Sequence, residues 1–484
     1  MSSPPPRGLA RLRNHKKKLI ALAVLVLGPT FFHVGVRAGT HIEPPSVTVP
    51  AGEVNEAGDL RSFGRSYALH RGKILEVGLR GTPEEIGYSH SRLLYREMVA
   101  NEGTLYQQFE KYVPIPPLRW LIVDVSRLQF RAVDRGMPEE RTREIAAQSL
   151  GFQPDPYAGF MPTYHRLVFL QSLYDIALSF ERSPLLGCTS FALTDGAAFE
   201  GHALLARNFD FEAGPIFDEG KAVFLVRQEG RIPYASVAWP GLVGAVSGMN
   251  LEGVSIVVHG ARAREASPDG EPVVHTMRDV LGRARTTADA IAILREKKPM
   301  VPHMVMIVDA AGDVAIAERV PGEPLFVRSG RGKVPLTNHL EGPLASDPAN
   351  RRVEASTSTW PRRKRLDEIL ANLPAGASVQ DAVRVLRDKF GPGDQALELG
   401  DRRTLDALIA THGVVLDATA KAIWVSEGPH LVGRFVKFDL ARLLAEGYVP
   451  GSDRTEEAVA ADPIESNGAY DAWKRAGSPH HGAN

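Results

Sequence analysis

The hydrophobic pattern of this chain changes at residue 188, and this change constrains the fold more than any other feature. Before it, apolar residues recur at helical spacing over 82–112 and 162–180. After it, short apolar runs of strand length are separated by turn residues, at 190–193, 203–206, 222–226, 235–239, 254–258, 304–308 and 314–318. Helical patterns lie between or after these runs, at 277–295, 362–372 and 379–390. This succession predicts an α+β fold with antiparallel sheets covered by helices.

Local signals place the first helix. Thr82 is a suitable N-cap and Pro83 fits the first turn, while Glu84 and Glu85 complement the positive end of the helix dipole. The second helical stretch stops at Arg182-Ser183-Pro184, a helix-breaking sequence.

The first 40 residues are typical of an export signal. An apolar run over 19–36 has no charged side chain. Six basic residues precede it: Arg7, Arg11, Arg13, Lys16, Lys17 and Lys18. The run approaches the roughly 20 residues that span a bilayer, and a basic flank stays on the cytoplasmic side. We therefore expect residues 1–40 to be a signal peptide or signal anchor, and the rest to lie on the periplasmic or extracellular side. Val36-Arg37-Ala38 offers a cleavage site, so both removal and retention in the membrane remain open.

Composition shifts divide the remainder. A proline-containing linker covers 41–58, a helical N-terminal segment 59–187, a strand-rich catalytic body 188–450 and a polar tail 451–484. Lys plus Arg equals Asp plus Glu at 57 each, which excludes a strong field for a polyanion. We expect no nucleic-acid partner.

The only cysteine, Cys188, follows Gly187 at the junction of the two halves. A lone cysteine is more often an inert buried side chain, but a free thiol in an exported protein is a hazard unless it has a use. Attack of this thiol on the open glycine carbonyl gives a thioester that water hydrolyses, which frees an amine on Cys188. That amine titrates near pH 8, close to a thiol, so one residue can supply both nucleophile and base.

Two charged residues follow at the end of an apolar strand. Arg207 can stabilise a thiolate, and Asp210 can hold the terminal amine by a hydrogen bond. A local surface ion pair is the alternative. Nearby Asp218 and Glu219 are better explained as a solvated acidic loop than as a cation site. With the histidines scattered and no zinc, phosphate-loop or serine-hydrolase motif, we expect neither metal nor cofactor.

Three motifs resemble the penicillin acyltransferase-like (acyl-CoA:isopenicillin N acyltransferase-like) group of cysteine N-terminal nucleophile (Ntn) hydrolases. They are Gly-Cys-Thr-Ser-Phe at 187–191, Arg-Asn-Phe-Asp at 207–210 and Thr-Asn-His at 337–339. Bile-salt hydrolases, penicillin V acylases and acid ceramidase are similar more distantly, and the likeness covers about 60–447. The resemblance implies an αββα sandwich of two stacked antiparallel sheets. It also implies self-cleavage between Gly187 and Cys188 into alpha and beta chains that stay associated.

The resemblance also implies roles for individual residues. Cys188 would be the nucleophile, Arg207 and Asp210 its charge partners, and Asn338 an oxyanion-hole donor through its side-chain amide. A turn-forming asparagine is the alternative for Asn338.

Two further site residues are less well defined by the motifs. A backbone amide near His259 or Gly260 would be the second oxyanion donor, although this segment departs from the asparagine or tyrosine of the relatives. Arg362 occupies the place of a second active-site arginine, with Arg363 and Arg365 as competitors for the register.

These observations predict an exported or membrane-anchored enzyme that hydrolyses or transfers the acyl group of a small-molecule linear N-acyl amide through a thioester on Cys188. One alternative is a catalytically silent binding protein for acylated ligands at the membrane. Another is a peptidase that uses the same fold.

Overall fold

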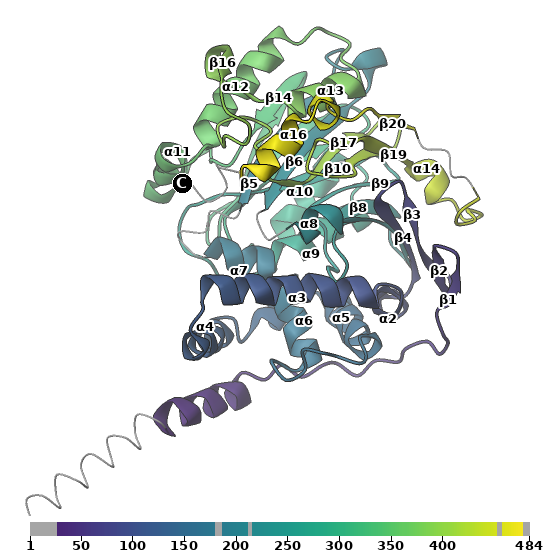
Figure 1. Ribbon diagram of the computed structural model, residues 1–484, viewed down its shortest axis with the longest axis vertical. Coiled ribbons are helices and arrows are strands. Elements are labelled where there is room, and N and C mark those ends of the chain that lie inside the picture. Colours follow the sequence, from purple (N-terminus) through teal and green to yellow (C-terminus); the bar gives the residue numbers. More distant parts are fainter. Residues whose placement is uncertain (1–26, 180–185, 212–214, 453–456, 478–484) are drawn as a thin grey trace, which may run out of the picture.

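The computed structural model describes residues 27–179, 186–211, 215–452 and 457–477, which form two stacked β-sheets with helices outside them (Figure 1). A buried cluster between the sheets joins Leu69, Val257 and Met306 of one to Leu205 and Val414 of the other. The α+β class and the αββα layering predicted from the sequence are therefore confirmed.

The larger sheet has eleven strands. In spatial order they are β1 (Asn55–Ala57), β2 (Leu60–Phe63), β3 (Ser66–Arg71), β4 (Ile74–Gly81), β7 (Ala222–Gln228), β8 (Tyr234–Ala238), β9 (Ser247–Asn250), β10 (Ser255–Gly260), β11 (His303–Val308), β12 (Val314–Arg319) and β13 (Phe326–Gly330). All neighbours are antiparallel except β4 and β7, which pair in parallel from Leu75 opposite Ala222 to Gly81 opposite Gln228. The early strands thus extend the sheet formed by the later part of the chain.

The smaller sheet has seven strands and carries the cysteine. Its order is β14 (Lys333–Leu336), β5 (Leu186–Leu193), β6 (Leu204–Phe211), β17 (Ala410–Asp417), β18 (Ala422–Ser426), β19 (Phe435–Asp439) and β20 (Ala458–Val459). A separate two-stranded ribbon pairs β15 (Phe390–Gly391) with β16 (Gln395–Ala396). β14 pairs only with Ser190 to Leu193 of β5, so Cys188 pairs with Phe209 of β6 on one side and lies beyond the end of β14 on the other.

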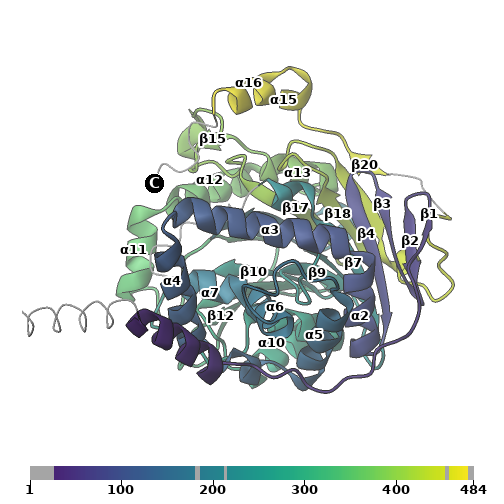
Figure 2. The same ribbon diagram turned by 60° about the horizontal axis from the view of Figure 1, so that its bottom comes forward.

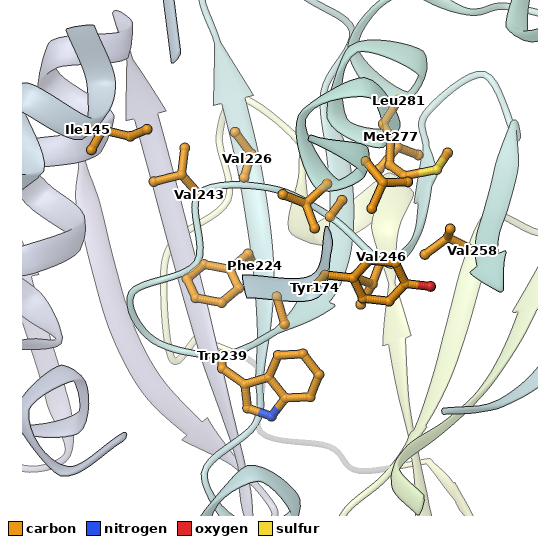
Figure 3. Close-up of a cluster of buried hydrophobic side chains, with 14 of the residues drawn as sticks. Ile145, Tyr174, Phe224, Val226, Trp239, Val243, Val246, Val258, Met277 and Leu281 are labelled. Carbon is orange, nitrogen blue, oxygen red and sulfur yellow. The ribbon is translucent and has the colours of Figure 1, made fainter. Parts of the chain in front are cut away.

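Helices cover both outer faces (Figure 2). They are α2 (Pro83–Leu93), α3 (Tyr95–Tyr112), α4 (Pro116–Gln129), α5 (Glu139–Gly151), α6 (Thr163–Gln171), α7 (Leu173–Ser179), α8 (Ile216–Glu219), α9 (Val273–Arg283), α10 (Thr287–Glu296), α11 (Pro348–Ser356), α12 (Thr359–Asn372), α13 (Val379–Leu386), α14 (Leu440–Leu443), α15 (Pro463–Ser466) and α16 (Ala469–Arg475). Figure 3 shows where Tyr174 of α7 and Met277 of α9 meet Val258 of β10 in the layer over the larger sheet.

The predicted N-cap of the first helix is confirmed. Thr82 Oγ1 accepts a hydrogen bond from the Glu85 amide at 3.3 Å, and the Glu85 carboxylate accepts one from the Thr82 amide at 2.8 Å. This capping box satisfies two amides that the helix itself cannot pair. The predicted 82–112 helix is divided at Leu94 into α2 and α3.

Both ends of the predicted domain scheme contain more structure than expected. Segment 59–187 begins with β2, β3 and β4 before its helices, and β1 lies within the predicted linker. In the predicted polar tail, Tyr470 and Trp473 of α16 are buried against Leu408 and Val432. The strands β2 to β4 were not predicted because β4 pairs with β7, a strand far along the chain in which Ala222 lies opposite Leu75. A local sequence pattern does not indicate such a distant pairing.

Residues 27–39 are helical, whereas residues 19–26 of the predicted apolar run lie outside the described residues. Within the described part of the chain, no helix combines the length and apolar character needed to cross a membrane.

Candidate active site

Cys188 is completely buried in β5, and the strand runs without interruption through the Gly187–Cys188 bond. The register with β6 places Gly187 opposite Asp210 and Cys188 opposite Phe209. Cys188 and Phe209 belong to the same buried cluster as Tyr174 of α7 and Val258 of β10. The thiol therefore lies where the two sheets and a covering helix meet.

Arg207 of β6 holds its guanidinium against the sulfur. Its Nη2 lies 3.4 Å from Cys188 Sγ and donates to the Val258 carbonyl at 2.6 Å. Its Nη1 donates to the Val246 carbonyl at 2.7 Å and to the Ser247 hydroxyl. The ring of Phe209 lies beneath the guanidinium, 4.2 Å from its central carbon. These contacts fix a cation beside the thiol, as the sequence predicted.

Asp210 lies against the glycine that precedes the cysteine. A Cβ atom built on Gly187 would be 3.1 Å from Asp210 Oδ2, closer than side chains normally approach. The position therefore favours glycine because of the neighbouring carboxylate. Asp210 is thus beside the bond that the self-cleavage hypothesis requires to break.

Asn338 contacts the backbone of the cysteine. Its Oδ1 accepts from the Cys188 amide at 2.8 Å and from Arg362 Nη2 at 2.9 Å. Both partners are obligate donors, so the oxygen must face them and Nδ2 must face the Gly260 carbonyl, 3.2 Å away. The Asn338 amide in turn donates to Thr359 Oγ1 at 2.8 Å, which anchors the residue to the start of α12.

The contacts of Arg362, Arg363 and Arg365 show which of these three arginines faces the site. Arg362 Nη1 donates to the Cys188 carbonyl and, at 2.8 Å, to Thr189 Oγ1. Arg363 instead binds Glu341 and Asp367, and Arg365 binds Asp388 and Asp394. Of the three candidates, Arg362 is the one that faces the site.

His259 and Gly260 reach the site in a different way from that predicted. Gly260 presents its carbonyl oxygen, an acceptor, to Asn338 Nδ2. His259 contributes its side chain, whose Nε2 lies 2.6 Å from Ser190 Oγ. An oxyanion requires donors, so these contacts do not supply one, and the predicted backbone donor at this position stays a prediction.

Burial dominates the electrostatics of the unbroken chain. It raises the pKa of the Cys188 thiol, assisted by the charge of Asp210 and opposed by Arg207 and Arg362. The pKa values of His259 and His412 are held well below the usual histidine value by burial and by the nearby Arg207 cation. The thiol is therefore protonated at neutral pH, and these imidazoles are neutral.

Two site residues were not found from the sequence. Ser247 Oγ accepts from Arg207 and lies 3.0 Å from His412 Nε2, and the His412 ring stacks on Phe209 at 5.1 Å. Neither the residue types nor their spacing indicates that Ser247, 40 positions from Arg207, would hold its guanidinium.

We expect Ser247→Ala to lower kcat about 10- to 100-fold with little change in KM, because a hydrogen bond to a charged group contributes about 1.5–3 kcal/mol. The acidic limb of the pH profile of kcat/KM should also move to higher pH, since a less well-held Arg207 stabilises the thiolate less. Ser236→Ala, at a similarly buried serine of β8, is the matched control. An unchanged pH profile in Ser247→Ala would contradict the positioning role.

An apolar cavity of about 100 Å³ is lined by residues that neighbour Cys188, although not by Cys188 itself. Its wall includes Tyr174, Phe209, Trp239 and Val246, with further residues from α3 and α6. Phe209 pairs with Cys188 across the sheet and stacks on Tyr174 at 6.5 Å, while the Val246 carbonyl binds Arg207. Residues that line the cavity therefore also neighbour Cys188 and its partner Arg207.

Among the residues that the structure describes, no group of three or more His, Cys, Asp or Glu could hold a metal ion. Asp218, one of the two acidic residues weighed above, is paired with Lys221 at 2.8 Å.

The layered sheets and a buried cysteine flanked by arginines agree with the αββα arrangement of Ntn hydrolases. Residues 198–411 match the family model described as "Acyl-coenzyme A:6-aminopenicillanic acid acyl-transferase". This match covers fewer than half of the 484 residues, and it agrees with the resemblance of the sequence motifs to the penicillin acyltransferase-like group of amidohydrolases and acyltransferases. The matched range contains Arg207, Asp210, Asn338 and Arg362 and begins ten residues after Cys188.

Three solved structures are similar over about half of the chain. A Caenorhabditis elegans N-acylethanolamine-hydrolyzing acid amidase ortholog is 15% identical with a TM-score of 0.37, over 48% of this chain and 93% of its own. Penicillin V acylase from Agrobacterium tumefaciens is 17% identical with a TM-score of 0.35, over 52% and 91%. A mutant of conjugated bile acid hydrolase from Clostridium perfringens is 13% identical with a TM-score of 0.37, over 57% and 97%. No curated protein matches the chain.

Proposed function

We propose that the chain cleaves itself between Gly187 and Cys188 and then hydrolyses linear N-acyl amides through a thioester on Cys188. One observation carries the proposal: Arg207 Nη2 lies 3.4 Å from a fully buried thiol whose own amide is bound at 2.8 Å by Asn338. A sulfur packed for stability alone needs no guanidinium beside it.

Self-cleavage begins with attack of the Cys188 sulfur on the Gly187 carbonyl carbon. As the carbon–nitrogen bond breaks, the thiol proton passes to the departing Cys188 nitrogen, which leaves a thioester and a free amine. Water then adds to the thioester, so that Gly187 ends as a carboxylate and the sulfur regains its proton. Arg207 stabilises negative charge on sulfur, and Asp210 lies at the glycine side of the bond.

The new amino group supplies the base for substrate turnover. It accepts the thiol proton, the thiolate attacks the substrate carbonyl, and the ammonium returns the proton to the leaving amine. Water, activated by the same amine, then resolves the acyl-enzyme. His259 and His412 are poorly suited to act as the base, because burial disfavours their protonation and both imidazoles are engaged with serine hydroxyls.

Asn338 supports the developing oxyanion in this scheme. Its Nδ2 carries two hydrogens, of which one donates to Gly260, so the second can be directed at the substrate oxygen. A neutral amide provides this donor without a buried charge in the resting enzyme.

The apolar cavity beside Cys188 favours an apolar acyl group as the part of the substrate that is transferred to sulfur. Hydrolysis is favoured over transfer to an amine, because water is always present whereas an acceptor needs a binding site of its own. The alpha and beta chains would stay together, since α2 to α7 pack on the sheet that the later strands complete.

Intact-mass analysis and peptide mapping of the purified full chain test the proposal. We expect two associated fragments, one ending at Gly187 and one beginning at Cys188. Acid quenching during reaction with N-acyl amides of increasing chain length should add the acyl mass to the Cys188 peptide. An unbroken wild-type chain without an adduct would instead support the silent binding protein, and turnover of peptides alone would support the peptidase.

A further inference from the structure

The helix at 27–39 has an inverted distribution of polar and apolar residues. His33, Val36, Arg37 and Thr40 recur at helical spacing and face the body of the protein. His33 Nδ1 lies 2.7 Å from Asp124 Oδ2 of α4, and Thr40 Oγ1 accepts from Arg127 Nε at 3.0 Å. The outward face has no charged side chain. A surface helix in water normally shows the opposite arrangement.

Helix α4 has the same inversion. Of its three charged residues, Asp124 and Arg127 are buried and Arg119 is partly buried, whereas Leu118, Leu121 and Val125 are exposed by 42%, 48% and 50%. These three leucine and valine side chains follow at i, i+3 and i+7, so they form one continuous stripe along the helix.

The two helices lie side by side in both views (Figures 1 and 2), joined by the His33–Asp124 contact and by the rings of His33 and Trp120 at 5.2 Å. Together with the last residue of α3 and the turn that precedes α4, they hold ten of the 14 large hydrophobic side chains that are exposed in the described residues. We name these ten the apolar face: Leu27, Phe31, Phe32, Val34, Tyr112, Ile115, Leu118, Trp120, Leu121 and Val125. An exposed concentration of this kind marks an interaction surface.

We infer that the apolar face inserts into the interfacial layer of a lipid bilayer, so that α4 and the 27–39 helix hold the folded body against the membrane. Trp120 and Tyr112 have the amphipathic rings that favour this layer. Their neighbours in the face are aliphatic or phenyl groups that would contact the acyl chains.

The sequence upstream favours lipid over a second copy of the chain. Residues 1–26 contain six basic and no acidic side chains, and they lead directly into the 27–39 helix. Anionic lipid head groups complement this charge. A symmetric dimer through the same face would bring two equally basic segments together, at a cost in repulsion.

Binding of the full chain to vesicles of phosphatidylcholine and phosphatidylglycerol separates these possibilities. We expect the triple variant Leu118→Glu, Leu121→Glu, Val125→Glu to bind at least tenfold more weakly than the wild type. The control variant Leu150→Glu, Trp360→Glu, Val449→Glu changes three other exposed apolar residues and should bind like the wild type. Far-UV circular dichroism would verify that both variants are folded.

A second readout does not depend on affinity. With brominated acyl chains, a quenched tryptophan component should be present in the wild type and in Trp360→Phe, and absent in Trp120→Phe. Equal vesicle binding by the α4 triple variant, together with quenching that survives in Trp120→Phe, would overturn the inference. A change from dimer to monomer in the triple variant without loss of vesicle binding would also overturn it, in favour of a self-association surface.

Discussion

Replacing Cys188 by alanine is expected to leave one uncleaved chain with no measurable amide hydrolysis. The substitution removes the nucleophile of both proposed reactions, and loss of a nucleophile lowers turnover by about 10⁴-fold or more. Intact mass reports the first effect, and initial rates with an N-acyl amide report the second.

Folding should survive this change. The sulfur is buried, but its removal deletes a single heavy atom, so the cost in unfolding free energy is expected to be about 1 kcal/mol. A melting temperature close to that of the wild type would show that the loss is chemical. Cys188→Ser is the matched comparison, because its hydroxyl is a weaker nucleophile in the same place and should cleave and turn over slowly. Scission of Cys188→Ala before residue 188 at the wild-type rate would assign the cut to another protease and refute self-cleavage.

The sequence predicted the strands of the central layers well because each one has an apolar face that must be buried. The runs at 222–226, 304–308 and 314–318 lie within β7, β11 and β12. By contrast, β2 to β4 were assigned to a helical segment. Their place in the sheet depends on the pairing of β4 with β7, a contact between distant residues that no local period records.

In the candidate site too, some residues could be predicted from the sequence and others needed the structure. Cys188, Arg207, Asp210 and Asn338 were found because motifs carry them, and the structure brings all four together around the Gly187–Cys188 bond.

The choice of Arg362 over its two neighbours needed the structure. All three arginines lie within about one turn of α12, and only their partners in space distinguish them. Arg363 and Arg365 face carboxylates, whereas Arg362 meets the Cys188 carbonyl. Ser247 has no motif and holds Arg207 from a different sheet, so no pattern in the sequence could have reported it.

Asn338→Ala is expected to lower kcat/KM about 10²- to 10³-fold, since one oxyanion donor contributes about 3 kcal/mol to transition-state stabilisation. The measurement is steady-state hydrolysis by protein whose processing has been quantified by mass. Because Asn338 also binds the Cys188 amide in the unbroken chain, alanine should slow self-cleavage as well.

Asn338→Asp separates the two functions of this residue. A carboxylate keeps the oxygen that accepts from the Cys188 amide and from Arg362, but it lacks the Nδ2 donor and adds negative charge where the oxyanion forms. We therefore expect Asn338→Asp to fold and to hold Cys188 in place, yet to hydrolyse amides even more slowly than Asn338→Ala. Turnover by Asn338→Asp at the wild-type rate would show that only the oxygen of Asn338 matters. Another group in the site would then have to donate to the oxyanion. Arg362, which binds Asn338 Oδ1, is the candidate.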